Sequence, residues 1–390
     1  MKIRTQPRRD GIALVIVLIV IMVLGILAGR FATSMKVETT LARNAALDAD
    51  LEWLGRSGVE LARYVIAEES AGPMGMVDSL MKKWAGGPGD TNSPVAGIPL
   101  DRYELGAGWI AVKIIDNDRK FNINVAALDE SMQRQRGQAG VLGQAMFLIG
   151  VEQEARSAII ESIVDWCDTD KLITGSSGAE TAYYETLQPA YRAKNGPFDD
   201  LSELLLVKGV TPAVYWGSGA AGHMQVLNRP QMLRGSQFQE PSYAIGLVDL
   251  FTPLSGRTIN INTVSATVLQ LIPEIDENMV NLIISSPEWR AGPDGADGTE
   301  DDMPFRSPQE IMGRLPMLGG PPGSGGPAGP GGPGAPGGMG VTRYFGVRSI
   351  VFEVQVDAHI GNYHRKYVAV LRRTNNPRDL QVLSFCWKSS

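Results

Sequence analysis

The chain has 390 residues, a length that predicts two or three structural units rather than one domain. Hydrophobic residues make up 44% of it, enough for a packed core, and the formal net charge is −6. Because an acidic chain is repelled by a phosphate backbone, this balance argues against nucleic acid as a partner.

The first predicted element is an apolar helix. No charged residue lies between Asp10 and Arg30. At about 1.5 Å per residue, a helix over this run spans roughly 28 Å, close to the hydrocarbon core of a bilayer at about 30 Å. The segment before it is basic, which holds that end in the cytoplasm and sends the rest of the chain outward. A cleaved signal peptide would have a shorter apolar core, whereas a plain single-pass anchor stays open on composition alone.

Residues 30–70 are predicted to continue the same helix. Apolar side chains recur at spacings of three and four with charges between them, and Gly72-Pro73 ends the pattern. One face of this segment must therefore be covered by another element. The apolar positions are Phe31, Met35, Leu41, Ala45, Leu51, Leu54, Val59, Ala62 and Ile66.

Strand patterns lie far apart in the chain. The first covers residues 108–115, and the others cover residues 348–357, 365–372 and 380–387, with a Gly-Asn hairpin turn at 361–362. The simplest interpretation is one antiparallel sheet interrupted by a long insertion. Helical spacing within the insertion appears at residues 144–165, 201–206 and 265–284, and a Gly/Pro-rich run at 319–340 predicts a flexible linker.

No pattern of a common enzyme class is present in the sequence. It has three histidines, and it contains no His-Glu-x-x-His motif, no Gly-x-Ser-x-Gly elbow and no phosphate-binding loop. We therefore expect a protein without catalytic residues. Its two cysteines, Cys167 and Cys386, either form one disulfide or remain two buried free thiols.

Two loops are rich in carboxylates. Asp165, Asp168, Asp170 and Glu180 supply hard oxygen ligands of the kind that Ca²⁺ takes in sets of six to eight. Their spacing is not that of an EF-hand, and a solvated acidic loop is the alternative. Residues 294–302 have a similar density of acidic groups and are a weaker candidate for a cation site.

Residues 258–310 suggest a rival function. They resemble the helix-hairpin-helix module of extracellular DNA receptors, which binds phosphate with the backbone amides of a glycine-containing turn. Here the turn at 273–278 lacks glycine and carries three carboxylates, which repel phosphate. The alternative function is therefore an extracytoplasmic DNA-binding protein or a membrane-anchored receptor.

The N-terminus resembles that of a type IV prepilin. A short basic leader ends in Gly11, and an apolar helix without a polar cap begins at Ile12. The resemblance implies that a prepilin peptidase cuts between Gly11 and Ile12 and that the new N-terminus is methylated. Most prepilins carry glutamate at the fifth mature position, which here is Ile16. The family that characteristically lacks this acid is the type II secretion minor pseudopilin K.

Internal motifs extend the resemblance to most of the chain. They are Asp-Trp-Cys-Asp-Thr-Asp at 165–170, Gly-Ala-Glu at 178–180, Pro-Ala-Tyr-Arg-Ala-Lys-Asn at 189–195 and Ser-Glu-Leu at 202–204. The implied fold is α+β, with a long pilin-like N-terminal helix packed on an antiparallel β-sheet and a large, mainly α-helical domain inserted in the sheet. The expected division is a prepilin leader at 1–11, the transmembrane N-terminal helix at 12–29, the periplasmic helix and first strands at 30–120, the inserted helical domain at 121–317, the Gly/Pro-rich linker at 318–340 and the C-terminal strands at 341–390.

The same resemblance implies a function. The chain would be a single-pass protein of the inner membrane, with its bulk in the periplasm, which caps the tip of the secretion pseudopilus and helps to initiate its assembly for protein export. The implied partners are other minor pseudopilins in a tip complex, the prepilin peptidase, the inner-membrane assembly platform, membrane lipid, exported substrate and the secretin, with no nucleic acid. The resemblance also implies a structural Ca²⁺ bound by Asp165, Asp168, Asp170, Glu180 and Asn195.

Overall fold

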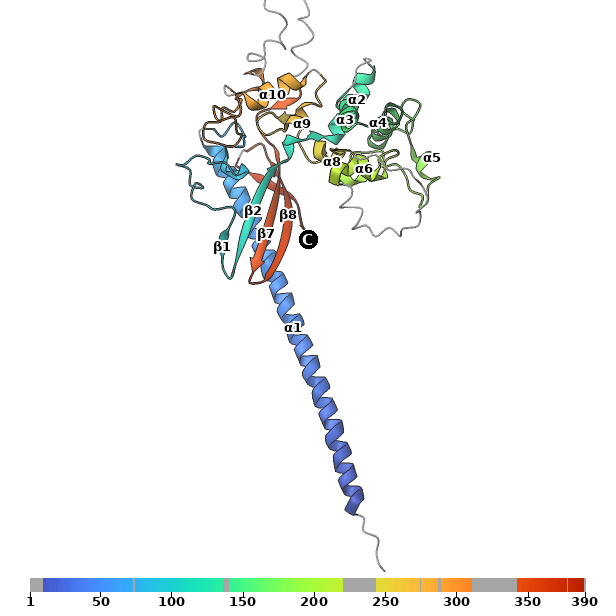
Figure 1. Cartoon of the computed structure of the whole chain (residues 1–390), viewed down its shortest axis with the longest axis vertical. Coiled ribbons are helices and arrows are strands. Elements are labelled where there is room, and N and C mark those ends of the chain that lie inside the picture. The colour runs from blue at the N-terminus through green and yellow to red at the C-terminus, as the bar shows by residue number, and fades with distance from the viewer. Residues whose placement is uncertain are drawn as a thin grey trace, which may run out of the picture.

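A computed structural model describes residues 10–72, 74–135, 140–219, 243–273, 275–286, 289–310, 342–376 and 378–388. The predicted linker at 318–340 and most of the predicted leader lie outside these residues. The chain folds as a long helix, α1 (Asp10–Ala71), whose distal end packs on a β-sheet, with a large, mainly helical insertion beyond the sheet (Figure 1). This confirms the predicted α+β, pilin-like fold.

Helix α1 has two halves with different surroundings. It is long and apolar enough to cross a membrane, and no residue of its apolar window is buried. Burial begins at Leu51 and continues through Ile66, where one side of the helix lies on the sheet. The expected cover is therefore absent over residues 30–50 in the single subunit, where Phe31 and Leu41 are exposed. Figure 1 shows this half projecting away from the body.

The sheet has five antiparallel strands in the order β1-β2-β7-β8-β9. Alternation of buried and exposed residues directs one face of β2 and β7 onto α1. Two glycines let the helix approach, since a Cβ on Gly55 would lie 2.5 Å from the Tyr367 ring and one on Gly58 would lie 2.5 Å from Val356. The strands are β1 (Tyr103–Leu105), β2 (Gly108–Asp116), β7 (Val351–Ile360), β8 (Tyr363–Arg373) and β9 (Leu380–Lys388).

The insertion lies between β2 and β7, which are distant in the sequence but pair directly in the sheet. Its described helices are short, and they surround a core separate from the one beneath α1. Its elements are η2 (Asn117–Arg119), β3 (Phe121–Asn122), α2 (Ile123–Gln135), α3 (Val141–Ile149), α4 (Gln153–Cys167), α5 (Thr181–Tyr184), η3 (Leu201–Leu206), α6 (Pro212–Trp216), η4 (Gly217–Gly219), α8 (Leu247–Leu250), β4 (Phe251–Thr252), β5 (Ile259–Asn260), α9 (Ala266–Leu269), α10 (Glu277–Ser285) and β6 (Phe345–Gly346). In Figure 1, α2 to α6 and α8 lie to one side of the sheet, while α9 and α10 lie above its end.

Three predicted helices differ in detail. The helix expected over 144–165 is two helices, α3 and α4, because Gly150 ends the first in a left-handed conformation with φ of 91°. The helix expected over 265–284 is likewise α9 and α10 with a turn between them. Residues 201–206 form a 3₁₀ helix. The cysteines are unpaired, with Cys167 half-buried and Cys386 exposed.

A buried polar joint connects the insertion to the sheet. Asp78 is fully buried and forms ion pairs with Arg373 at 2.6 Å and Lys82 at 3.1 Å. Although burial alone would raise the pKa of Asp78, these two cations lower it below its ordinary value. Asn260 of β5 donates to the Asp78 carbonyl at 3.0 Å, so the start of the α9–α10 region is fixed to the sheet.

Asp116 continues the joint at the end of β2. Its carboxylate accepts hydrogen bonds from the hydroxyls of Thr263, at 2.6 Å, and Ser349. Burial, with the neighbouring Asp118 carboxylate, raises the pKa of Asp116 to about 7. The sequence did not predict this role for Asp116, because its partners lie more than a hundred residues away in the chain.

Candidate functional site

The carboxylate motif, which comprises Asp165, Asp168, Asp170 and Glu180, begins at the C-terminal end of α4. Asp165 is in the last turn, and Asp168 is the C-cap residue, whose backbone N–H donates to Val164 O at 2.9 Å. The C-terminus of a helix carries partial negative charge and favours cations nearby, yet the last turn of α4 has no basic residue. The acidic groups at this end add to the negative charge of the helix terminus, so the site attracts a cation.

Aromatic packing holds the motif in place. Trp166 is buried and lies against Phe198 and Tyr184, with ring centroids 6.4 and 5.4 Å away. Its indole N–H donates to Glu203 Oε2 at 3.4 Å. Cys167 also faces inward, and burial raises the pKa of its thiol to about 12, so it is a packed thiol rather than a reactive one. Because Trp166 is anchored in this way, Asp165 and Asp168 on either side of it have defined directions.

Three carboxylates converge beside this anchor. Asp168, Asp170 and Glu180 each offer an oxygen, and these oxygens all lie within 4.8 Å of one another. Glu180 reaches the group from the start of α5, where its side chain also accepts a hydrogen bond from Thr181 N at 3.3 Å. The structure thus brings together three of the five predicted ligands, from the end of α4, the following loop and the start of α5. In the described parts of the chain, this is the one group of three acidic, histidine or cysteine side chains with such convergence.

Several of these oxygens have no hydrogen-bond donor. Asp168 Oδ1 and Glu180 Oε1 are buried atoms without a hydrogen-bond partner among the described residues, and so is Asp165 Oδ2. Glu180 is only 4% exposed and Asp165 is fully buried. Leaving a buried carboxylate oxygen unpaired costs on the order of 1–3 kcal/mol or more. The donor set therefore fits a hard cation such as Ca²⁺, which would satisfy these oxygens together.

The protonation behaviour of the site agrees with this. Burial, with the charges of Asp170, Asp165 and Glu180, raises the pKa of Asp168 to about 6. Burial also raises the pKa values of Asp165 and Glu180. Like charges facing one another disfavour ionisation, and a bound cation would remove that penalty.

The other two predicted ligands lie outside the convergent group. Asp165 Oδ1 accepts from Thr174 N at 2.8 Å, which fixes the loop after α4. Asn195 has φ of 47°, and its side-chain N–H₂ donates to the carbonyl of Asp170 and to Glu180 Oε2 at 3.4 Å. Both residues position the carboxylates in this arrangement.

The helix-hairpin-helix region has a different local chemistry. The side chain of Asp276 caps α10 by accepting from Met279 N at 2.8 Å. A carboxylate therefore occupies the helix N-terminus at which a phosphate would have to bind. This geometry argues against the DNA-binding alternative.

Comparison with known proteins places this region in a family. The model for the type II secretion system (T2SS), protein K, matches residues 119–216, which include all of the carboxylate motif. The type II secretion system protein K of Aeromonas hydrophila is 24% identical over 251 residues, which are 63% of this chain and 71% of that protein. Protein K of Pseudomonas aeruginosa is 27% identical over 207 residues, 51% of this chain and 57% of that protein. Over residues 119–216 the chain therefore matches the family of type II secretion system protein K, and it is similar to the protein K of two bacteria.

The fold of this protein K relative also has a solved counterpart. It is similar to a chain in the crystal structure of the GspK-GspI-GspJ complex from the type 2 secretion system of enterotoxigenic Escherichia coli. The TM-score is 0.58 at 17% identity, over 90% of this chain and 99% of that one. The likeness supports the pilin-like fold. The matched family belongs to the type II secretion system.

The predicted processing site lies at the start of α1. The helix begins at Asp10 and runs without interruption through Ile12 into the apolar segment. Ile12 is exposed, with 66% of its surface accessible. Among the described residues, α1 is the one helix long and apolar enough to cross a membrane, which is consistent with a single-pass membrane anchor.

Proposed function

We propose that this protein is a minor pseudopilin that caps the tip of the type II secretion pseudopilus and helps to start its assembly. The observation that carries the proposal is the distribution of bulk in Figure 1, with a bare apolar helix at one end and the wide insertion at the other. A helix exposed over its apolar half can pack among the helices of neighbouring subunits. An insertion fixed to the sheet by the buried Asp78 and Asp116 joint obstructs the addition of a subunit above it.

The proposed partners are the minor pseudopilins that correspond to GspI and GspJ, the subunits named together with GspK in the related complex. Before assembly the chain would be anchored in the inner membrane by α1, with the body in the periplasm. It would contact the prepilin peptidase and the assembly platform there, and exported substrate and the secretin from the tip.

The test of capping is the position of the chain in a filament. Gold-labelled antibody against the insertion, applied to sheared pseudopili, should mark one end of each filament. Co-purification of the full chain with its I and J counterparts should give a defined complex. Label spaced along the shaft, or no association with either counterpart, would contradict the proposal.

We also propose that a prepilin peptidase cleaves between Gly11 and Ile12 and that Ile12 is then N-methylated. Mass spectrometry of the protein from cells that contain the peptidase should find Ile12 as the first residue, with the mass of one added methyl group. Gly11→Val should retain the leader. An intact leader on the unaltered protein would overturn this part.

A third proposal concerns calcium, which Asp168, Asp170 and Glu180 would bind directly. A bound Ca²⁺ would supply positive charge at the end of α4. Asp165 and Asn195 would then hold the loops in position around the ion through the bonds to Thr174 and to the Asp170 carbonyl. The role is structural, because it joins the end of α4 to the start of α5. Calorimetric titration of the full chain in detergent should give one site that Asp168→Ala with Asp170→Ala removes.

A further inference from the structure

The two edges of the five-stranded sheet are built differently. Strand β1 is three residues long, and its edge carries the Arg102–Glu104 ion pair at 2.8 Å. Strand β9 has nine residues, and its one charged side chain is the terminal Lys388. Short, charged edges resist pairing with other chains, whereas a long and weakly charged edge accepts them. Among the described strands, none pairs with the outer side of β9.

Strand β9 also exposes apolar side chains on the face that α1 covers further along the sheet. Trp387 is 61% exposed and Val382 is 42% exposed. Phe385, between them, stacks on Tyr367 with ring centroids 5.2 Å apart. The apolar face of the sheet that packs on α1 therefore continues across β9, where its side chains are exposed to solvent.

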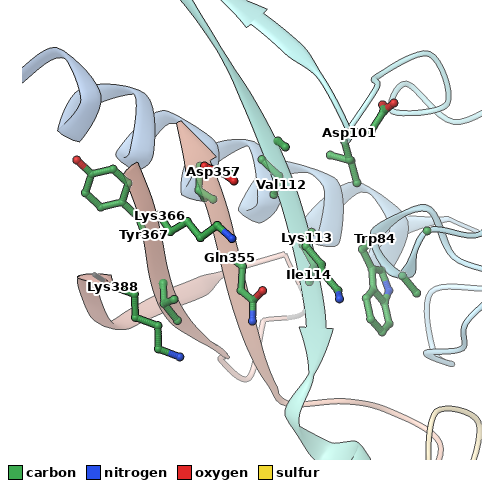
Figure 2. A pocket seen from close by; sticks show the side chains of 16 residues that line it. Trp84, Asp101, Val112, Lys113, Ile114, Gln355, Asp357, Lys366, Tyr367 and Lys388 are labelled. Carbon is green, nitrogen blue, oxygen red and sulfur yellow. The ribbon is translucent and has the colours of Figure 1, made fainter. Parts of the chain in front are cut away.

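The opposite face of the sheet carries three lysines, and Asp357 of β7 lies opposite one of them, Lys366. Lys366 of β8 lies directly opposite Lys388 of β9 in the antiparallel register, an arrangement of like charges that is destabilising. Lys113 of β2 lies on the same face, and none of the three lysines forms an ion pair in the described chain. The three lysines line an open groove of about 640 Å³. Figure 2 shows their side chains, with α1 behind the strands.

From these observations we propose that the free edge of β9 is a docking site for an extended strand of a partner protein. The partner strand alternates acidic and apolar residues. Its backbone pairs with β9, its carboxylates lie on the lysine face beside Lys388 and Lys366, and its apolar side chains cover Val382 and Trp387. Side chains of a strand alternate between faces, so one sequence pattern satisfies both surfaces. A basic surface on a chain of net charge −6 makes an acidic partner the complementary one.

This surface is present whether or not the chain caps a filament, so it can be tested apart from that proposal. The probe is a blocked peptide of about ten residues, the length of β9, that alternates glutamate and valine. We expect the full chain in detergent to bind it, with affinity that falls as salt rises, and to bind a lysine–valine peptide at least about tenfold more weakly. Lys366→Glu with Lys388→Glu should reverse this preference. The matched control, Lys171→Glu, exchanges an exposed lysine on the insertion and should leave it unchanged.

Hydrogen exchange decides whether a strand is added. The glutamate–valine peptide should slow the exchange of β9 amides and leave that of β1 unchanged. Equal binding of the two peptides, absence of binding, or binding without protection of β9 would overturn the proposal. So would an oligonucleotide that competes fully with the peptide, since the lysines would then form a general site for polyanions.

Discussion

The two carboxylate-rich loops of this protein have similar composition and opposite chemistry. In the loop at 294–302, bonds within the protein already engage the aspartates. Asp297 accepts hydrogen bonds from Nε and Nη2 of the buried Arg290, at 2.9 and 2.7 Å. Asp301 accepts from Thr299 Oγ1 at 2.8 Å, and Asp302 accepts from Gly298 N at 2.8 Å. In the loop at 165–180, Asp168, Asp170 and Glu180 converge instead on one another, and two of their oxygens lack donors.

The pKa directions separate individual aspartates rather than whole loops, since burial also raises the pKa of Asp302. Hydrogen bonds from Thr299 and from the Asp294 backbone lower the pKa of Asp301, whereas burial and neighbouring carboxylates raise the pKa of Asp168 to about 6. Composition therefore cannot identify a cation site. The deciding property is whether the carboxylate oxygens are still free of donors once the loop has folded.

The largest expected effect is a loss of stability when the internal hydrogen bonds of the loop at 294–302 are removed. Arg290 is 4% exposed and also donates to the carbonyls of Ile261 and Val264, at 3.1 and 2.6 Å. Arg290→Met leaves these acceptors and Asp297 without their partner, so it should lower the free energy of unfolding by about 3–5 kcal/mol. Thermal unfolding of the full chain in detergent, followed by circular dichroism, measures this. Arg306→Met, at an exposed position, is the control, and an equal loss in both variants would contradict the argument.

The second prediction concerns the response to calcium. At a Ca²⁺ concentration of about 100 times Kd, binding should stabilise the chain by about 2.7 kcal/mol. Asp168→Ala with Asp170→Ala should remove this gain, whereas Asp294→Ala with Asp301→Ala should preserve it. Paired melts with Ca²⁺ and with chelator give the result. Loss of the calcium response in the second variant would show that the loops had been assigned to the wrong roles.

The third prediction follows from the raised pKa of Asp168. Protons compete with Ca²⁺ below about pH 6, so affinity should fall about tenfold between pH 7 and pH 5. Without calcium, the stability of the chain should change with pH in the opposite direction to the calcium affinity. A carboxyl whose pKa is raised in the folded state binds more protons there than when unfolded, so its contribution to stability declines as pH rises from about 4 to about 6. Asp168→Asn should flatten that decline, and an unchanged slope would contradict the raised pKa.

The smallest effect concerns Asn195. Asn195→Gly keeps a residue that tolerates the φ of 47° but loses the bonds to Asp170 O and Glu180, at a cost of about 1 kcal/mol. Asn195→Ala should lose about 1 kcal/mol more, because a Cβ disfavours that conformation. Unfolding melts of both variants measure the difference, and Ala equal to Gly would show that the backbone conformation carries no cost.

Sequence reasoning succeeded where the signal is local. The apolar run after Gly11, the alternation in residues 108–115 and the turn at 361–362 each specify an element through neighbours in the chain, and α1, β2 and the β7–β8 hairpin follow them. It was less accurate over 144–165, where Gly150 stops a helix that apolar spacing alone would continue. The joint at Asp78 and Asp116 was missed for a different reason, because its partners Arg373 and Ser349 come from distant segments.

By itself, the sequence determined which segment is apolar enough to cross a bilayer, which segments form strands or helices, and which family the chain resembles, because hydrophobic periodicity and short motifs lie in consecutive residues. Only the tertiary structure decided which carboxylates remain without donors, which lysines face one another across β8 and β9, and where the insertion is attached. These properties depend on donors and charges brought together from remote parts of the chain, and no local pattern records them.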